Sequence, residues 1–83
     1  MSQYKIVIDK RALRFIAKQP RTQQERILKA IYKLPHEGNI KSLAGKKDEY
    51  RLRLGDYRII YSIHEDILTV KVLNAGNRGD VYK

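Results

Sequence analysis

The spacing of apolar positions changes along the chain, and each spacing predicts a different element. Residues 3–8 alternate between apolar and polar side chains as a strand does. Residues 9–34 then carry apolar side chains three and four positions apart, which is typical of helices. Asp9 is expected to cap the first helix, and Pro20 to open the second. Three further strands are predicted, over residues 49–54, 57–64 and 67–74.

This order of elements, β-α-α-β-β-β, predicts the fold class. We expect an α+β domain in which the two helices pack on one face of a mainly antiparallel, twisted four-stranded sheet. Residues 36–48 lack a regular apolar period, so we expect a loop with one helical turn, held to the core by Ile40 and Leu43. The chain has no internal repeat or composition shift, which predicts a single domain over residues 1–83.

Residues 50–61, YRLRLGDYRIIY, predict a hairpin that brings arginines together. Gly55 followed by Asp56 suits a two-residue turn in which the glycine takes a positive φ. Arg53 then lies directly opposite Arg58, and like charges in such a pair repel. The pairing therefore raises the question of what compensates the repulsion.

A second hairpin is predicted to turn at Glu65-Asp66, which would pair Tyr61 with Val70 and Ile59 with Val72. This register gathers the apolar side chains on one face: Leu52, Leu54, Tyr57, Ile59, Tyr61, Ile63, Leu68, Val70 and Val72. The other face would carry the arginines, with Lys71 across from Ile60. The last strand is expected to place Asn74 beside Tyr57 and to deliver the tail residues Asn77, Arg78 and Tyr82 to the same cluster.

The charge balance indicates a polyanionic partner. Eighteen Lys and Arg against nine Asp and Glu give a formal charge of +9, and such self-repulsion destabilises a compact chain. Nucleic acid, an anionic membrane surface and an acidic protein are the candidate partners. A solvated strand face would explain the arginines without any ligand, and Asp48, Glu49 and Asp56 are available to neutralise them. The arginine pairing and the arriving tail arginine favour an anion-binding site.

Other functional classes find little support in the residues. The chain has no cysteine, so disulfides and thiolate metal sites are excluded, and His36 and His64 do not form a metal-binding motif. The N-terminal residues lack the apolar core of a signal peptide, and no stretch is long enough to span a membrane. We therefore expect a cytoplasmic protein without a cofactor, a bound metal or a membrane partner.

The hairpin EYRLRLGDYRIIYSI, followed by ILTVKVLNAGNRGDVYK, resembles the RelE/ParE superfamily, the toxins of bacterial type II toxin–antitoxin systems. The resemblance covers essentially the whole chain and implies a RelE-like fold. Members of the RelE branch are ribosome-dependent mRNA interferases, endoribonucleases that inhibit translation by cutting mRNA in the ribosomal A site. Members of the ParE branch share the fold and inhibit DNA gyrase. The resemblance also implies a cognate antitoxin, with the toxin a monomer within that complex.

The resemblance assigns roles by position and favours the RelE branch. Its catalytic residues would be Arg51, Arg53, Arg58, Arg78 and Tyr82, and the implied RNA contacts are Lys46, Lys47, Lys71 and Asn77. Cleavage would proceed without metal, by attack of the substrate's own 2′-OH on the neighbouring phosphorus.

The general base is the point at which this chain departs from RelE-like toxins. Many of them have lysine at a strand position and some have histidine before the tail arginine, whereas this chain has arginines and Asn77. Glu49, Lys71 or a ribosomal group are the candidate bases, because arginine keeps its proton. Two other functions stay open: a gyrase-inhibiting toxin without ribonuclease activity, and an RNA-binding module without catalysis.

Overall fold

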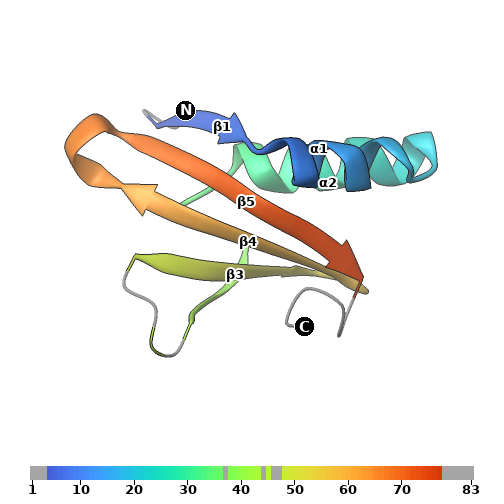
Figure 1. Cartoon of the computed structure of the whole chain (residues 1–83). Coiled ribbons are helices and arrows are strands. Elements are labelled where there is room, and N and C mark those ends of the chain that lie inside the picture. The colour runs from blue at the N-terminus through green and yellow to red at the C-terminus, as the bar shows by residue number, and fades with distance from the viewer. Residues whose placement is uncertain (1–3, 37, 44, 46–47, 78–83) are drawn as a thin grey trace.

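The structure, a computed structural model, describes residues 4–36, 38–43, 45 and 48–77. Within them, two helices lie on one side of a five-stranded sheet of order β1-β5-β4-β3-β2 (Figure 1). The strands are β1 (Lys5–Ile8), β2 (Asn39–Ser42), β3 (Glu49–Leu54), β4 (Tyr57–His64) and β5 (Thr69–Asn77), and the helices are α1 (Lys10–Ala17) and α2 (Arg21–Tyr32). The predicted α+β class with two N-terminal helices on one sheet face is confirmed.

Both helices begin where the sequence predicts. The Asp9 side chain accepts a hydrogen bond from the Arg11 backbone N–H at 3.0 Å, and Pro20 directly precedes α2. Each helix buries one stripe of side chains against the sheet, represented by Ile16 in α1 and Ile31 in α2. In the described part of the chain, no helix is long and apolar enough to cross a membrane.

The sheet has one strand more than the sequence predicts. Residues 39–42 form β2, an edge strand antiparallel to β3, whereas residues 36–48 were expected to be a loop. The segment is short and polar apart from Ile40, so its pattern carries no strand signal. Backbone pairing with β3 holds it, and Ile40 lies across from Leu52 and packs against the core as expected. β1 pairs with β5 in parallel, and the remaining pairs are antiparallel.

The first hairpin has the predicted register, and the second differs from it. Arg53 pairs with Arg58 and Leu54 with Tyr57 around Gly55, whose φ is 58°. In the second hairpin a 3₁₀ turn over Glu65–Ile67 replaces the expected two-residue loop.

This longer turn shifts the register of β5 by two residues, so that Tyr61 pairs with Val72 instead of Val70. A shift of two keeps the β5 side chains from Thr69 to Val72 on their predicted faces, because the side-chain period of a strand is two. Leu68 is the exception: it lies in the turn at a φ of 46°, is 43% exposed, and is not part of the apolar face.

The core lies between the helices and one face of the sheet. Its buried residues come from every layer, with Ile27, Ile31 and Leu34 from the helical side and Leu52, Ile59, Tyr61, Val70 and Val72 from the strands. Tyr61 is fully buried, and its ring stacks on Tyr50 at a centroid distance of 5.6 Å. Burial and the neighbouring Tyr50 raise the pKa of Tyr61 to about 12.

We expect Tyr61→Phe to stabilise the fold. The Tyr61 hydroxyl has no hydrogen-bond partner among the described residues, and a buried unsatisfied hydroxyl costs roughly 1–3 kcal/mol. Folding raises the pKa of the Tyr61 hydroxyl, so the folded state favours its neutral form. The part of the free energy of unfolding that depends on this neutral form is complete below pH 10 and is lost as the pH rises toward about 12. Urea titrations at neutral pH and near pH 11 should show a more stable variant with a smaller alkaline loss. A less stable variant would contradict this account of the hydroxyl.

Candidate functional site

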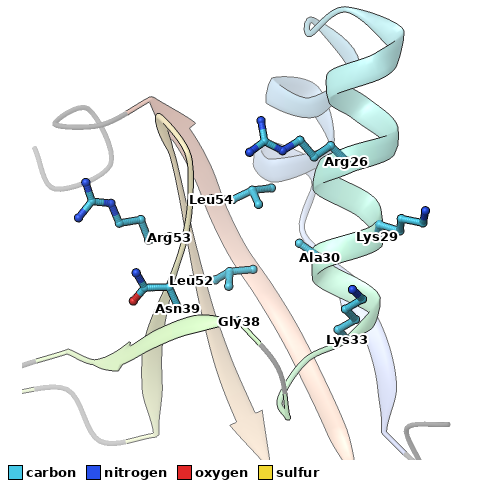
Figure 2. Close-up of a pocket in the computed structure, with 9 residues that line it drawn as sticks. All are labelled: Arg26, Lys29, Ala30, Lys33, Gly38, Asn39, Leu52, Arg53 and Leu54. Carbon is cyan, nitrogen blue, oxygen red and sulfur yellow. The ribbon is translucent and has the colours of Figure 1, made fainter.

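The sheet face turned away from the helices carries the basic side chains, and we call it the arginine face. Figure 2 shows Leu52 and Leu54 of β3 pointing toward α2, and Arg53 between them pointing to the opposite side. Arg51 and Arg58 share that side, because Arg51 alternates with Leu52 and Arg58 pairs with Arg53. The arginine face is therefore centred on Arg51, Arg53 and Arg58, as the sequence predicts.

Strand pairing extends this cluster into two neighbouring rows. In one row Asn39 of β2 lies beside Arg53, which faces Arg58. In the next row Lys41 of β2 lies beside Arg51. Lys41 was not recognised in the sequence because its segment was expected to be a loop. Its contribution follows only from the pairing of β2 with β3.

The three arginines differ in exposure and hence in what they can reach. Arg53 is exposed, whereas Arg58 on the central strand β4 is only 7% exposed. Arg51 is half-buried, and its Nε is buried without a hydrogen-bond partner among the described residues. Neither Arg51 nor Arg53 forms an ion pair with any described carboxylate. Asp48, Glu49 and Asp56 therefore form no ion pair with these two guanidinium groups.

A β-bulge decides which residues of β5 join the arginine face. The register shifts between Ile60 and Tyr61, so that Asn74 pairs with Ile60 and Gly76 with Arg58. Asn74 was expected beside Tyr57, and that pairing was wrong. The bulge inserts one unpaired residue and reverses the alternation of the strand beyond it. Glycine, which has no side chain, therefore lies next to the buried arginine.

The other predicted site residues are distributed as follows. Lys71 lies across from Ser62, not from Ile60 as expected, but on the predicted face. Asn77 was expected in the arginine cluster, and that placement was wrong. Asn77 pairs with Tyr57 on the helix side of the sheet, because the bulge reverses the alternation of β5. Lys46, Lys47, Arg78 and Tyr82 lie outside the described residues. The structure thus brings three of the five predicted catalytic residues together.

A polar group of residues lies at the far end of the arginine face. Glu49 of β3 pairs with Ser62 of β4, and Lys71 of β5 flanks Ser62 on the other side. Ser62 Oγ is hydrogen-bonded to His64 Nε2 at 2.9 Å. In the described part of the chain, no group of three or more His, Asp or Glu side chains is arranged to hold a metal ion.

A second basic surface lies on the helix side of the sheet. A cleft of about 410 Å³ lies between α2 and β3. Leu52 and Leu54 point toward α2 and Arg26 extends toward β3, whereas Lys29 points away from the strand (Figure 2). The lining residues of the cleft are Arg26, Lys29, Ala30, Lys33, Gly38, Asn39, Leu52, Arg53 and Leu54. A helical pattern does not say which strand the helix faces, so the sequence alone does not indicate this cleft.

Comparison with known proteins agrees with this architecture. Residues 6–82 match the family described as ParE toxin of type II toxin–antitoxin system, parDE. Comparison with curated protein sequences found no match.

Among solved structures, the archaeal RelE–RelB complex from Pyrococcus horikoshii OT3 is similar, with 30% identity, coverage of 96% of this chain and 99% of that one, and a TM-score of 0.76. The isolated E. coli RelE toxin has 28% identity, coverage of 95% and 90%, and a TM-score of 0.74. The intact E. coli RelBE toxin–antitoxin complex has 27% identity, coverage of 89% and 95%, and a TM-score of 0.76.

The family match extends over nearly the whole chain, and the similar structures share its full architecture. The predicted membership of the RelE/ParE superfamily is therefore confirmed. This chain is a toxin of a toxin–antitoxin system and belongs to the ParE toxin family, within the RelE/ParE superfamily.

Proposed function

We propose that this toxin is a ribosome-dependent endoribonuclease that cuts mRNA without a metal ion. The observation that carries the proposal is the arginine face, where Arg53 opposes Arg58 and Arg51 and Arg53 lack a described acidic partner. Guanidinium groups bind phosphate oxygens through paired hydrogen bonds, so a phosphodiester relieves the repulsion between them. RNA supplies both the phosphate and, in its 2′-OH, the attacking group, which DNA lacks.

The proposed reaction is an internal transesterification. The 2′ oxygen forms a bond to phosphorus while the bond from phosphorus to the 5′ oxygen breaks, which leaves a 2′,3′-cyclic phosphate and a 5′-hydroxyl. Arg53 and Arg58 hold the phosphoryl oxygens, on which negative charge increases in the transition state. Arg78 neutralises the departing 5′ oxygen, which takes a proton from water to become the 5′-hydroxyl, and Tyr82 orients the 2′-OH. Since arginine keeps its proton, the 2′-OH proton passes to another group. Glu49 and Lys71 lie in the row of Ser62, roughly 13 Å along β4 from Arg58, so we favour a ribosomal group as the base.

Two macromolecular partners follow from this proposal. The ribosome presents mRNA in its A site, and positioning of the reacting groups there contributes a large part of the rate. A cognate antitoxin is the second partner, because similar toxins were solved as complexes with RelB-type antitoxins. We place the protein in the cytoplasm, where both partners act.

Primer extension on a defined mRNA tests the function. Programmed ribosomes are incubated with the toxin in the presence of a chelator that removes free divalent ions after assembly. We expect discrete cuts within the A-site codon. Intact mRNA under conditions in which the toxin still arrests cell growth would contradict the proposal.

Gyrase inhibition is the second candidate function, and the match to the ParE toxin family favours it. A supercoiling assay with purified gyrase distinguishes the two functions. A toxin that blocks supercoiling and leaves mRNA intact would be of the gyrase-inhibiting kind.

We expect Arg53→Gln to weaken RNA binding uniformly across sequences. Arg53 is exposed on the arginine face, so its charge contacts phosphate and not a base. Each lost phosphate contact reduces the slope of log K against log salt by roughly 0.7 for single strands. Fluorescence anisotropy with a labelled oligouridylate over a series of salt concentrations measures the slope. Lys10→Gln, an exposed cation at the start of α1, serves as the control and should leave the slope unchanged.

A further inference from the structure

The end of the arginine face farthest from Gly55 differs in chemistry from the rest, and we call it the polar end. It consists of Glu49, Ser62, His64 and Lys71, contributed by β3, β4 and β5. The opposite end presents arginines and a lysine. The face therefore changes from rows in which cations lie beside Asn39 and the buried Ile60 to a row that offers both hydrogen-bond donors and acceptors.

Glu49 is the residue that needs an explanation. It is a half-buried carboxylate on a face that otherwise attracts anions, yet it forms no ion pair with a described lysine or arginine. A carboxylate repels phosphate, so the RNA backbone is not its ligand. Carboxylates do recognise nucleobases, by accepting hydrogen bonds from exocyclic amino groups.

Ser62 and His64 hold this end of the face in a fixed arrangement. Ser62 is 7% exposed, and its hydroxyl is fixed by the 2.9 Å hydrogen bond to His64. Polar groups whose positions are fixed before binding discriminate between ligands, because a mismatched ligand leaves them without a partner. Ser62 also lies between Glu49 and Lys71, so an acceptor and a donor flank it on the two neighbouring strands.

The polar end lies some distance along β4 from Arg53 and Arg58, where the scissile phosphate is proposed to bind. Ser62 follows Arg58 by four residues on β4, which corresponds to roughly 13 Å at the rise of a strand. A phosphate held between Arg53 and Arg58 is therefore too far away to contact Glu49. If the RNA strand runs along β4, the nucleotide next to the scissile phosphate would reach Glu49.

We propose that the polar end is a base-reading subsite, in which Glu49 accepts a hydrogen bond from the exocyclic amino group of a nucleobase beside the scissile phosphate. The inference rests on the proposed ribonuclease function. It predicts a preference for cytosine over uracil at that position, since the two pyrimidines have the same size and differ in the amino group that Glu49 would bind. Lys71 contacts the phosphate that links this nucleotide to the next one.

Cleavage of matched mRNAs on programmed ribosomes tests the preference. Each pair of mRNAs differs at a single position beside the cut, where one member has cytosine and the other has uracil. We expect wild-type toxin to favour cytosine at one of these positions by about tenfold in kcat/KM. Glu49→Gln keeps the size of the side chain but loses the charge, and should reduce the preference to about twofold. Glu25→Gln, the same substitution on the exposed surface of α2, should retain the full preference.

Binding of free RNA separates this inference from the ribonuclease function. Anisotropy with a labelled pentauridylate and its derivatives bearing one cytosine reports base discrimination without cleavage. Discrimination that Glu49→Gln abolishes supports the subsite even where no mRNA is cut, in which case only the ribonuclease function fails. Equal binding of all probes by wild type would overturn the subsite. The subsite would also be overturned if Glu49→Gln lowered kcat by the same factor on every mRNA. Glu49 would then act as a proton acceptor and not in base recognition.

Discussion

Arg58→Ala is expected to lower the single-turnover rate of mRNA cleavage on the ribosome by about 10²–10³-fold. Arg58 lies on the central strand, faces Arg53 and is 7% exposed. A guanidinium group held in this way needs little reorganisation when charge develops on the phosphoryl oxygens, so its loss removes stabilisation specific to the transition state. KM should change much less than kcat.

Two further variants make this result specific. Arg58→Lys keeps the charge but cannot form two parallel hydrogen bonds, so its rate should lie between wild type and Arg58→Ala. Arg14→Ala removes the same charge from the exposed surface of α1 and should cleave at the wild-type rate. A folded Arg58→Ala protein that cuts as fast as wild type would remove this residue from the reaction.

Leu52→Ala is expected to reduce the free energy of unfolding by about 2–5 kcal/mol. Leu52 is 1% exposed, belongs to the buried core and lies on β3 between Arg51 and Arg53. Truncating it removes apolar contact from the core and leaves a cavity beneath the strand that carries both arginines. Urea unfolding at neutral pH measures the loss.

Leu13→Ala is the matched control, because Leu13 is 48% exposed on α1 and its truncation removes little buried surface. It should cost much less than the core substitution. Comparable losses for the two leucines would contradict the assignment of Leu52 to the helix side of the sheet, and with it the placement of Arg51 and Arg53 on the other side.

The faces of the strands could be predicted from the sequence, whereas parts of their registers could not. The alternation in RLRL and the glycine of the turn determine that Arg53 faces Arg58, because only one hairpin register satisfies both. At the second hairpin, Glu65-Asp66 carries no glycine, and the sequence does not reveal that the turn extends through Leu68 at a positive φ. The bulge opposite Ile60 likewise depends on backbone geometry that side-chain pattern does not encode.

In the candidate site, too, residues on strands with a clear sequence pattern could be predicted, whereas residues placed by strand pairing could not. Arg51 and Arg58 were found because they lie on strongly patterned strands. Lys41 was missed because β2 is a strand only by pairing with β3. The relation between Glu49, Ser62 and Lys71 also needs three strands in register, and no single segment contains it. Residues brought together by sheet pairing are therefore the ones for which a structure is required.

Cleavage by attack of the 2′-OH requires that hydroxyl on the substrate, so replacing it tests the proposed reaction of the arginine face. An mRNA with a single 2′-deoxynucleotide at the mapped cleavage position is compared with the all-ribose mRNA on programmed ribosomes. We expect cleavage at the modified position to disappear, and the all-ribose product to end in a 2′,3′-cyclic phosphate by mass spectrometry. Undiminished cleavage of the deoxy-substituted mRNA, or a product with a 5′-phosphate, would contradict the proposed reaction.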